Sequence, residues 1–125
     1  MDCLFCKIQK PDFEKEIVYE NDFFYATRDS YPVTKFHTLI IPKRHIQSYF
    51  EMNINEIQSI NQILNFQRNE IIELDSSVTA FNIGINDGKD AGQSIYHLHV
   101  HLLSLIHISE PTRLRRRAHS VVVIE

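Results

Sequence analysis

Three histidines alternate along one short segment of the chain. The stretch YHLHVHLL spans residues 96–103 and places His97, His99 and His101 at every second position. A neutral imidazole can bind zinc, or one of its nitrogens can attack phosphorus as a nucleophile. A lone histidine on a strand is usually a half-buried residue with one hydrogen bond, but three in phase are costly to bury charged and hard to satisfy when neutral. The row therefore indicates a reactive or metal-binding site.

The loop before the histidines is typical of phosphate binding. It has the sequence NDGKDAGQS, residues 86–94, and holds two of the chain's three glycines. Gly88 and Gly92 allow close backbone approach, and successive N–H groups with the Ser94 hydroxyl could hold a phosphate. Taken alone, the loop fits a hairpin turn at least as well. Its direct junction with the histidine row favours the phosphate.

The only two cysteines form a CxxC pair near the N-terminus, Cys3 and Cys6. Two thiols supply half of a four-coordinate structural zinc site. Two buried thiols under the sheet are one alternative. A redox pair is another, although no thioredoxin-like βαβ pattern surrounds the cysteines.

The histidine spacing predicts an extended backbone. Residues two apart share one face of a strand, whereas on a helix they scatter around the axis. We expect the three imidazoles on one face, about 6–7 Å apart. The intervening residues should enter the core on the other face: Tyr96, Leu98, Val100 and Leu102.

The remaining elements predict an α+β fold. Residues 16–21 and 23–29 resemble a hairpin with a turn at Asn21-Asp22, and residues 37–43 and 78–86 are further strands. An amphipathic helix is expected from Asn53 to about Leu74, with Asn53 or Asn55 as its cap. Its apolar stripe, expected in the core or in a dimer interface, is Ile57, Ile60, Leu64, Ile71 and Leu74. The order favours an antiparallel sheet of about five strands with this one main helix on a face.

Composition places limits on the function. The 125 residues, 43% hydrophobic and 23% charged, fit one globular domain. The sequence contains neither a long apolar span nor a secretory signal, so we expect a cytoplasmic protein without a membrane partner. Residues 1–103 carry nine basic and fourteen acidic residues. That acidic balance argues against nucleic acid as a partner.

The segment HLHVHLL, residues 97–103, resembles the signature of the histidine-triad family, His-φ-His-φ-His-φ-φ with φ apolar, at all seven positions. The similarity extends through CLFCKI, ENDFFYATRD, HTLIIPKRHI and AGQSIYHLHVH, and so covers about residues 3–103. This resemblance implies a homodimeric α+β enzyme that binds a purine nucleotide conjugate, a phosphoramidate or a dinucleoside polyphosphate, and cleaves it at the α-phosphate. The alternatives are a nucleotide-binding or zinc-dependent scaffold without turnover, and a metal hydrolase with zinc held by the triad.

The resemblance also implies roles for individual residues. His99 matches the nucleophile that forms a nucleotidyl-histidine intermediate, and no catalytic metal is required. His101 and His37 match supporting histidines, and Asp29 matches a ribose-binding acid. The other substrate-binding positions are Phe5 and Ile8 for the base, and Asn86, Gly92, Ser94 and His97 for the phosphate or leaving group. In the bacterial-type branch, a structural zinc site would comprise Cys3, Cys6, His45 and His97. Phe36 departs from the family, which often has glycine there, and this predicts a narrower pocket near His37.

The end of the chain does not fit the family pattern. LSLIHISEPTR, beginning at Leu103, resembles the translation of a common transposase sequencing adapter. We therefore expect residues 1–103 to form the domain, truncated at its C-terminus, and residues 104–125 to be non-native. The competing interpretation is a genuine basic tail that recruits an acidic partner or a membrane surface.

Overall fold

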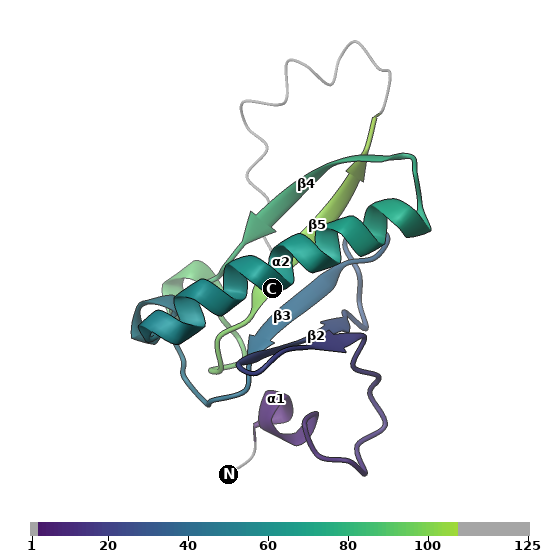
Figure 1. Ribbon diagram of the computed structural model, residues 1–125. Coiled ribbons are helices and arrows are strands. Elements are labelled where there is room, and N and C mark those ends of the chain that lie inside the picture. Colours follow the sequence, from purple (N-terminus) through teal and green to yellow (C-terminus); the bar gives the residue numbers. More distant parts are fainter. Residues whose placement is uncertain (1–2, 108–125) are drawn as a thin grey trace.

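A five-stranded antiparallel sheet organises the computed structural model, which describes residues 3–107. The strand order is β1-β2-β3-β5-β4, and helix α2 crosses one face of the sheet (Figure 1). The strands are β1 (Tyr19–Glu20), β2 (Phe24–Arg28), β3 (Thr38–Pro42), β4 (Val78–Gly84) and β5 (Val100–Ile106). The helices are α1 (Leu4–Lys7) and α2 (Ile54–Leu74), with short 3-10 turns η1 (Tyr49–Glu51) and η2 (Lys89–Ala91). The predicted α+β fold with one main helix is confirmed.

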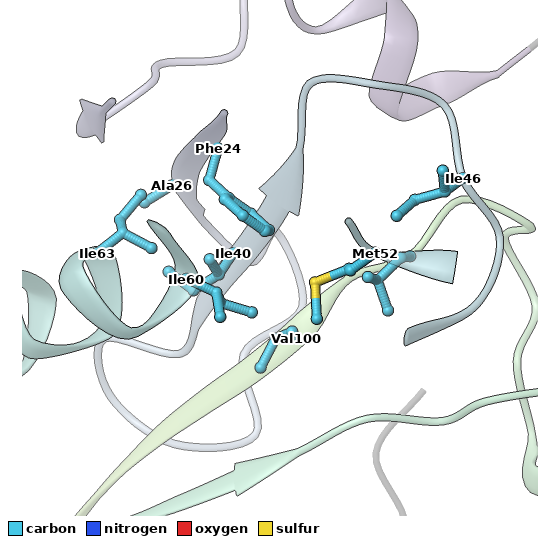
Figure 2. Packing of buried hydrophobic residues seen from close by; sticks show 9 residues of the cluster. Phe24, Ala26, Ile40, Ile46, Met52, Ile60, Ile63 and Val100 are labelled. Carbon is cyan, nitrogen blue, oxygen red and sulfur yellow. The ribbon is translucent and has the colours of Figure 1, made fainter. Parts of the chain in front are cut away.

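The two faces of the sheet have different cores. Alternating residues of β2, such as Phe24 and Ala26, join Ile40 and Val100 in a cluster beneath α2 (Figure 2). The intervening Tyr25 points to the opposite face, where it packs with Phe5 of α1 in a second cluster. Helix α2 therefore stabilises one face of the sheet, and the opposite face, beside α1, can hold a site.

Helix α2 begins at Asn53, one of the two predicted caps. The Asn53 carboxamide oxygen accepts a hydrogen bond from the Glu56 N–H at 2.9 Å, and Glu56 Oε1 accepts from the Asn53 N–H at 2.9 Å, which is a capping box. The buried Glu56 carboxylate also accepts hydrogen bonds from Nε and Nη2 of Arg44. Within residues 3–107, α2 and the shorter helices all lack the length or hydropathy needed to cross a bilayer.

Only part of the predicted apolar stripe of α2 lies in the core, and its placement in a dimer interface stays a prediction. Ile57 is 46% exposed and Leu74 is 58% exposed, whereas Ile63 and Gln67 are buried. The buried line runs through positions 60, 63, 67 and 71, because Gln67 takes a core position by accepting a hydrogen bond from Arg28 at 2.8 Å. Because Gln67 is polar, the pattern of apolar residues in the sequence does not identify it as part of the buried face of α2.

The strand that contains the histidines begins further along the chain than predicted. Residues 95–97 form a bend and β5 begins only at Val100. Tyr96, expected in the core, is 46% exposed because it lies on this bend, while Leu98, Val100 and Leu102 are buried as expected. Strand β5 continues to Ile106, opposite Val78 of β4, and so extends past residue 103. Residues 108–125, most of the predicted non-native tail, lie outside the described residues.

Phe36 has a left-handed backbone, with φ of 60°. Its ring packs against Ile71, Val78 and Leu102, on the α2 side of the sheet. That packing explains how a phenylalanine is held at a position where glycine carries no steric penalty. Neither Phe36 nor His37 lines the cavity beside His99, so the narrowing near His37 stays a prediction.

We expect Phe36→Gly to be more stable than Phe36→Ala by about 1 kcal/mol, the reverse of their usual order. Both variants lose the ring packing, but only alanine retains the strained φ. Urea denaturation of the two variants measures this difference. A glycine variant that is less stable than the alanine variant would show that the backbone at position 36 is not strained.

Candidate active site

The three triad histidines lie buried on the face opposite α2. The neighbours Leu98 and Val100 pack beneath α2, so the alternating imidazoles point away from it. The Phe5 ring of α1 covers two of the imidazoles, with ring centroids 5.8 Å from His97 and 4.9 Å from His99. The His99 and His101 centroids are 5.2 Å apart, which is closer than the spacing expected for a regular strand.

His99 is held in one tautomer. Its Nδ1–H donates to the backbone carbonyl of His97 at 2.8 Å, which leaves the lone pair on Nε2. Burial lowers the pKa of His99, while the His97 carbonyl and the Asp29 carboxylate oppose that shift. The ring is therefore neutral near pH 7, as a nucleophile must be.

His101 is connected to His37 across the sheet. The Val33 N–H donates to His37 Nδ1 at 3.1 Å, and His37 Nε2 lies 2.9 Å from His101 Nδ1. Because His37 Nδ1 accepts a hydrogen bond, the hydrogen of the neutral His37 ring is on Nε2, from which it is donated to His101 Nδ1. The hydrogen of the neutral His101 ring is therefore also on Nε2. The buried His101 Nε2 has no hydrogen-bond partner among the described residues. Its N–H is thus available to a bound ligand.

Burial makes His101 resistant to protonation. Its pKa is lowered to about 3 by burial and by the neighbouring His99 and His37. Burial also lowers the pKa of His37, against the raising effect of Asp29, whose Oδ2 lies 3.3 Å from His37 Nδ1. Both groups are therefore neutral in the folded chain at pH values where they titrate in the unfolded chain.

We expect stability to fall on acidification from about pH 6.5, the ordinary histidine pKa, toward pH 3. In that window the unfolded chain binds a proton at position 101 and the folded chain does not. His101→Asn should make the slope shallower by up to about 1.4 kcal/mol per pH unit. Urea denaturation at several pH values measures the slope, with His107→Asn, an exposed site, as control. Equal slopes in wild type and His101→Asn would refute the assignment.

A cavity of about 320 Å³ opens beside His99. Five of the predicted site residues line it: Phe5, Ile8, Asp29, Ser94 and His99. Asn86, Gly92, His37, His97 and His101 are not part of this lining. Phe13, Lys15 and Tyr31 line the cavity but were missed, because they are brought there by chain folding and no local motif marks them.

The glycine loop is shaped by two left-handed residues. Gly88 has φ of 99° and Gly92 has φ of 93° on either side of η2. A side chain at either position would be strained, which accounts for the two glycines. The Asn86 Nδ2 donates to the Ala91 carbonyl at 2.7 Å and so closes the loop from inside. Gln93, a buried neighbour of Ser94, was also missed, because a buried glutamine has no sequence signature.

The four predicted metal ligands converge. Cys3 Sγ lies 3.3 Å from His97 Nδ1, Cys6 Sγ lies 3.2 Å from His45 Nδ1, and the two Nδ1 atoms are 3.2 Å apart. Tetrahedral zinc holds two imidazole nitrogens about 3.3 Å apart and a nitrogen and a thiolate about 3.6 Å apart. The His97 Nε2–H donates to the Pro42 carbonyl at 2.8 Å, which directs the Nδ1 lone pair to the cluster. The donor set therefore fits zinc.

The triad itself does not form a metal site among the described residues. Its members fall into different groups of candidate ligands, with His97 beside the cysteines and His101 beside His37 and Asp29. His99 belongs to neither group. The geometry thus favours a free nucleophile over a metal ion held by all three histidines.

Comparison with known proteins places the chain in a family. Residues 10–107 match the HIT domain. A HIT family hydrolase from Legionella pneumophila is 31% identical, with a TM-score of 0.71 over 88% of this chain and 98% of that one. A Zn-bound histidine triad family protein from Mycobacterium smegmatis is 29% identical, with a TM-score of 0.77 over 86% and 78% of the two chains. Adenylylsulfatase HINT3 of Arabidopsis thaliana is 32% identical over 82% of this chain and 51% of its own length. The chain belongs to the HIT domain family of hydrolase-like proteins.

Proposed function

We propose that the chain is a nucleotide hydrolase or transferase that cleaves a purine nucleotide conjugate at its α-phosphate through a nucleotidyl-His99 intermediate. The observation that carries this proposal is the unprotonated Nε2 of His99, on a ring that lines the cavity. An apolar wall at Phe5 and Ile8 suits a purine, and Asp29 suits the ribose hydroxyls. The adenylylsulfatase relative supports an adenylyl group as the part transferred.

The first step forms a bond between His99 Nε2 and phosphorus. The bond from phosphorus to the leaving group breaks, and the leaving group keeps the bonding electrons and takes a proton from water, while the neutral His101 Nε2–H would donate a hydrogen bond to it without losing its hydrogen. The His97 carbonyl stabilises the substituted imidazole through its hydrogen bond to Nδ1–H. Water then attacks the same phosphorus, which releases the nucleoside monophosphate and restores His99. Asn86, Gly92 and Ser94 would hold the phosphate during both steps.

Both candidate substrate classes lead to the same intermediate. A phosphoramidate releases an amine, and a dinucleoside polyphosphate releases a shorter nucleotide, but each leaves a nucleoside monophosphate on His99. Incubation with a substrate labelled in its α-phosphate should label His99, which peptide mapping of the quenched protein would locate. Turnover without any label on His99 would exclude the covalent route.

The second candidate function is a zinc-dependent scaffold that binds nucleotide without turnover. The converging Cys3, Cys6, His45 and His97 favour it, because such a site can serve stability alone. Nucleotide affinity measured by calorimetry, with no product after prolonged incubation, would support this function over the first.

We propose that zinc binds at these four residues and is structural. Cys3, just before α1, and Cys6, within α1, would hold the zinc together with the two histidines and would so fix α1 to the sheet, whereas neither cysteine lines the cavity beside His99. Because both thiols are free, the site suits a reducing compartment such as the cytoplasm.

We also propose a homodimer. Strand β4 is an edge of the sheet, and Ile83 on it is exposed. A groove between β4 and α2 is lined in part by Leu64, Phe81 and Ile83. A second copy that covers this groove would remove the exposed edge. Sedimentation equilibrium should give the dimer mass, and Ile83→Lys should give the monomer mass.

A further inference from the structure

We propose that Gln93 is a positioning residue, which sets the phosphate-binding loop of residues 86–94 against the triad. The inference rests on the proposed function and adds a residue to it. Gln93 is only 4% exposed, so its carboxamide must be satisfied from within the protein.

The Gln93 carboxamide is satisfied entirely by backbone groups. Its Oε1 accepts from the Gly88 N–H at 2.8 Å, and its Nε2 donates to the carbonyls of Gln47 at 3.0 Å and Ile95 at 3.1 Å. One side chain therefore connects the start of the loop, the segment after β3, and the segment that leads into the histidines.

These bonds fix the residues on both sides of Ser94. The Gln93 N–H donates to the Gly88 carbonyl at 3.1 Å, so both the backbone and the side chain of Gln93 are held by Gly88. On the other side, the Ile95 carbonyl is held by Nε2. Ser94 lies between these two fixed points and lines the cavity beside His99. Gln93 thus controls where Ser94 and the neighbouring loop amides meet a phosphate.

The segment around Gln47, whose carbonyl accepts a hydrogen bond from Gln93, is itself hydrogen-bonded to the site. The Leu98 N–H donates to the Ile46 carbonyl at 2.7 Å, between His97 and His99. Asp87 Oδ2 accepts from the Ser48 hydroxyl and from the Tyr49 N–H, both at 2.9 Å. Residues 46–49 therefore act as a common support for the loop and for the nucleophile.

Only glutamine satisfies all three backbone groups. Glutamate would keep the bond from Gly88 but would place a carboxylate against the Gln47 and Ile95 carbonyls. Methionine would keep the length and shape of the side chain but none of its hydrogen bonds. Gln93→Met therefore isolates the bonds from the packing.

The test compares two ligands that differ by one phosphate. Adenosine 5′-monophosphate and adenosine are titrated calorimetrically into the full wild-type chain and into Gln93→Met. We expect the variant to bind the monophosphate about tenfold more weakly and adenosine equally well, since one or two lost hydrogen bonds correspond to about that factor. We also expect kcat to fall by a similar factor or more. Gln93→Glu should lose at least as much affinity for the monophosphate, because its buried carboxylate would face the Gln47 and Ile95 carbonyls.

Gln67→Met is the matched control. Gln67 is another buried glutamine, but it lies on α2 and bonds to Arg28 on the far face of the sheet. Its loss should lower the melting temperature and leave both affinities unchanged. An equal loss of both affinities in Gln93→Met, or no loss of either, would overturn the positioning role. A wild-type chain with neither turnover nor affinity for the monophosphate would instead overturn the proposed function, and this inference with it.

Discussion

Replacing His99 by alanine is expected to lower kcat by about a thousandfold or more, because removal of a covalent nucleophile leaves only binding and electrostatic stabilisation. Nucleotide binding should survive, since the cavity walls at Phe5, Ile8 and Asp29 remain. Single-turnover kinetics with an adenosine phosphoramidate measures the chemical step directly. Binding of adenosine 5′-monophosphate, measured in parallel, shows whether the site is intact.

His107→Ala is the control for this experiment. His107 is exposed and lies beyond the end of β5, so its loss should leave kcat within about twofold of wild type. A His99→Ala variant that retains full turnover would refute the covalent mechanism. The opposite result, an inactive variant that binds nucleotide normally, would support the proposed mechanism.

The second large effect concerns zinc. Saturating zinc is expected to raise the unfolding free energy of the chain by about 4 kcal/mol at a thousandfold excess over Kd. The reason is that the folded chain brings Cys3, Cys6, His45 and His97 together and the unfolded chain does not. Cys3→Ser should abolish most of this gain, because the site is left with three of its ligands. Denaturation with and without zinc, together with metal analysis, measures both quantities.

Chelator-treated wild type is the control, and it should match Cys3→Ser in stability. Its folded fraction should also retain turnover, since zinc is expected outside the cavity. Activity that is lost with chelator but persists in a chain without both cysteines would favour the metal hydrolase over the covalent route. Equal stability with and without zinc would contradict the metal site.

Local patterns were the part of this fold that the sequence could predict. The cap of α2 was narrowed from the sequence to Asn53 or Asn55, because a cap involves only neighbouring residues, and the structure has Asn53 in that place. The apolar residues that alternate with the histidines likewise placed Leu98 and Val100 in the core. The prediction that Tyr96 lies in the core was wrong, because a bend at residues 95–97 interrupts the alternation of buried and exposed side chains. The position of such a bend depends on the loop that precedes it.

Contacts between distant segments could not be derived from spacing. His37 and His101 are 64 positions apart, and only the pairing of β3 with β5 brings their rings together. The resemblance to a known family supplied that relation, as it supplied His45 for the cysteine pair. It gave no indication of Lys15, Tyr31 or Gln93, whose importance depends on burial and on the cavity they adjoin.

The two faces of the histidine segment make it intolerant of insertions and deletions. Leu98, Val100 and Leu102 stabilise the fold from one side, while the imidazoles between them serve the site from the other. Removal of a single residue between the loop and β5 would turn every following side chain to the opposite face. One codon lost there would bury imidazoles beneath α2 and leave aliphatic side chains facing the cavity, so the segment can tolerate substitutions but not a change in its length.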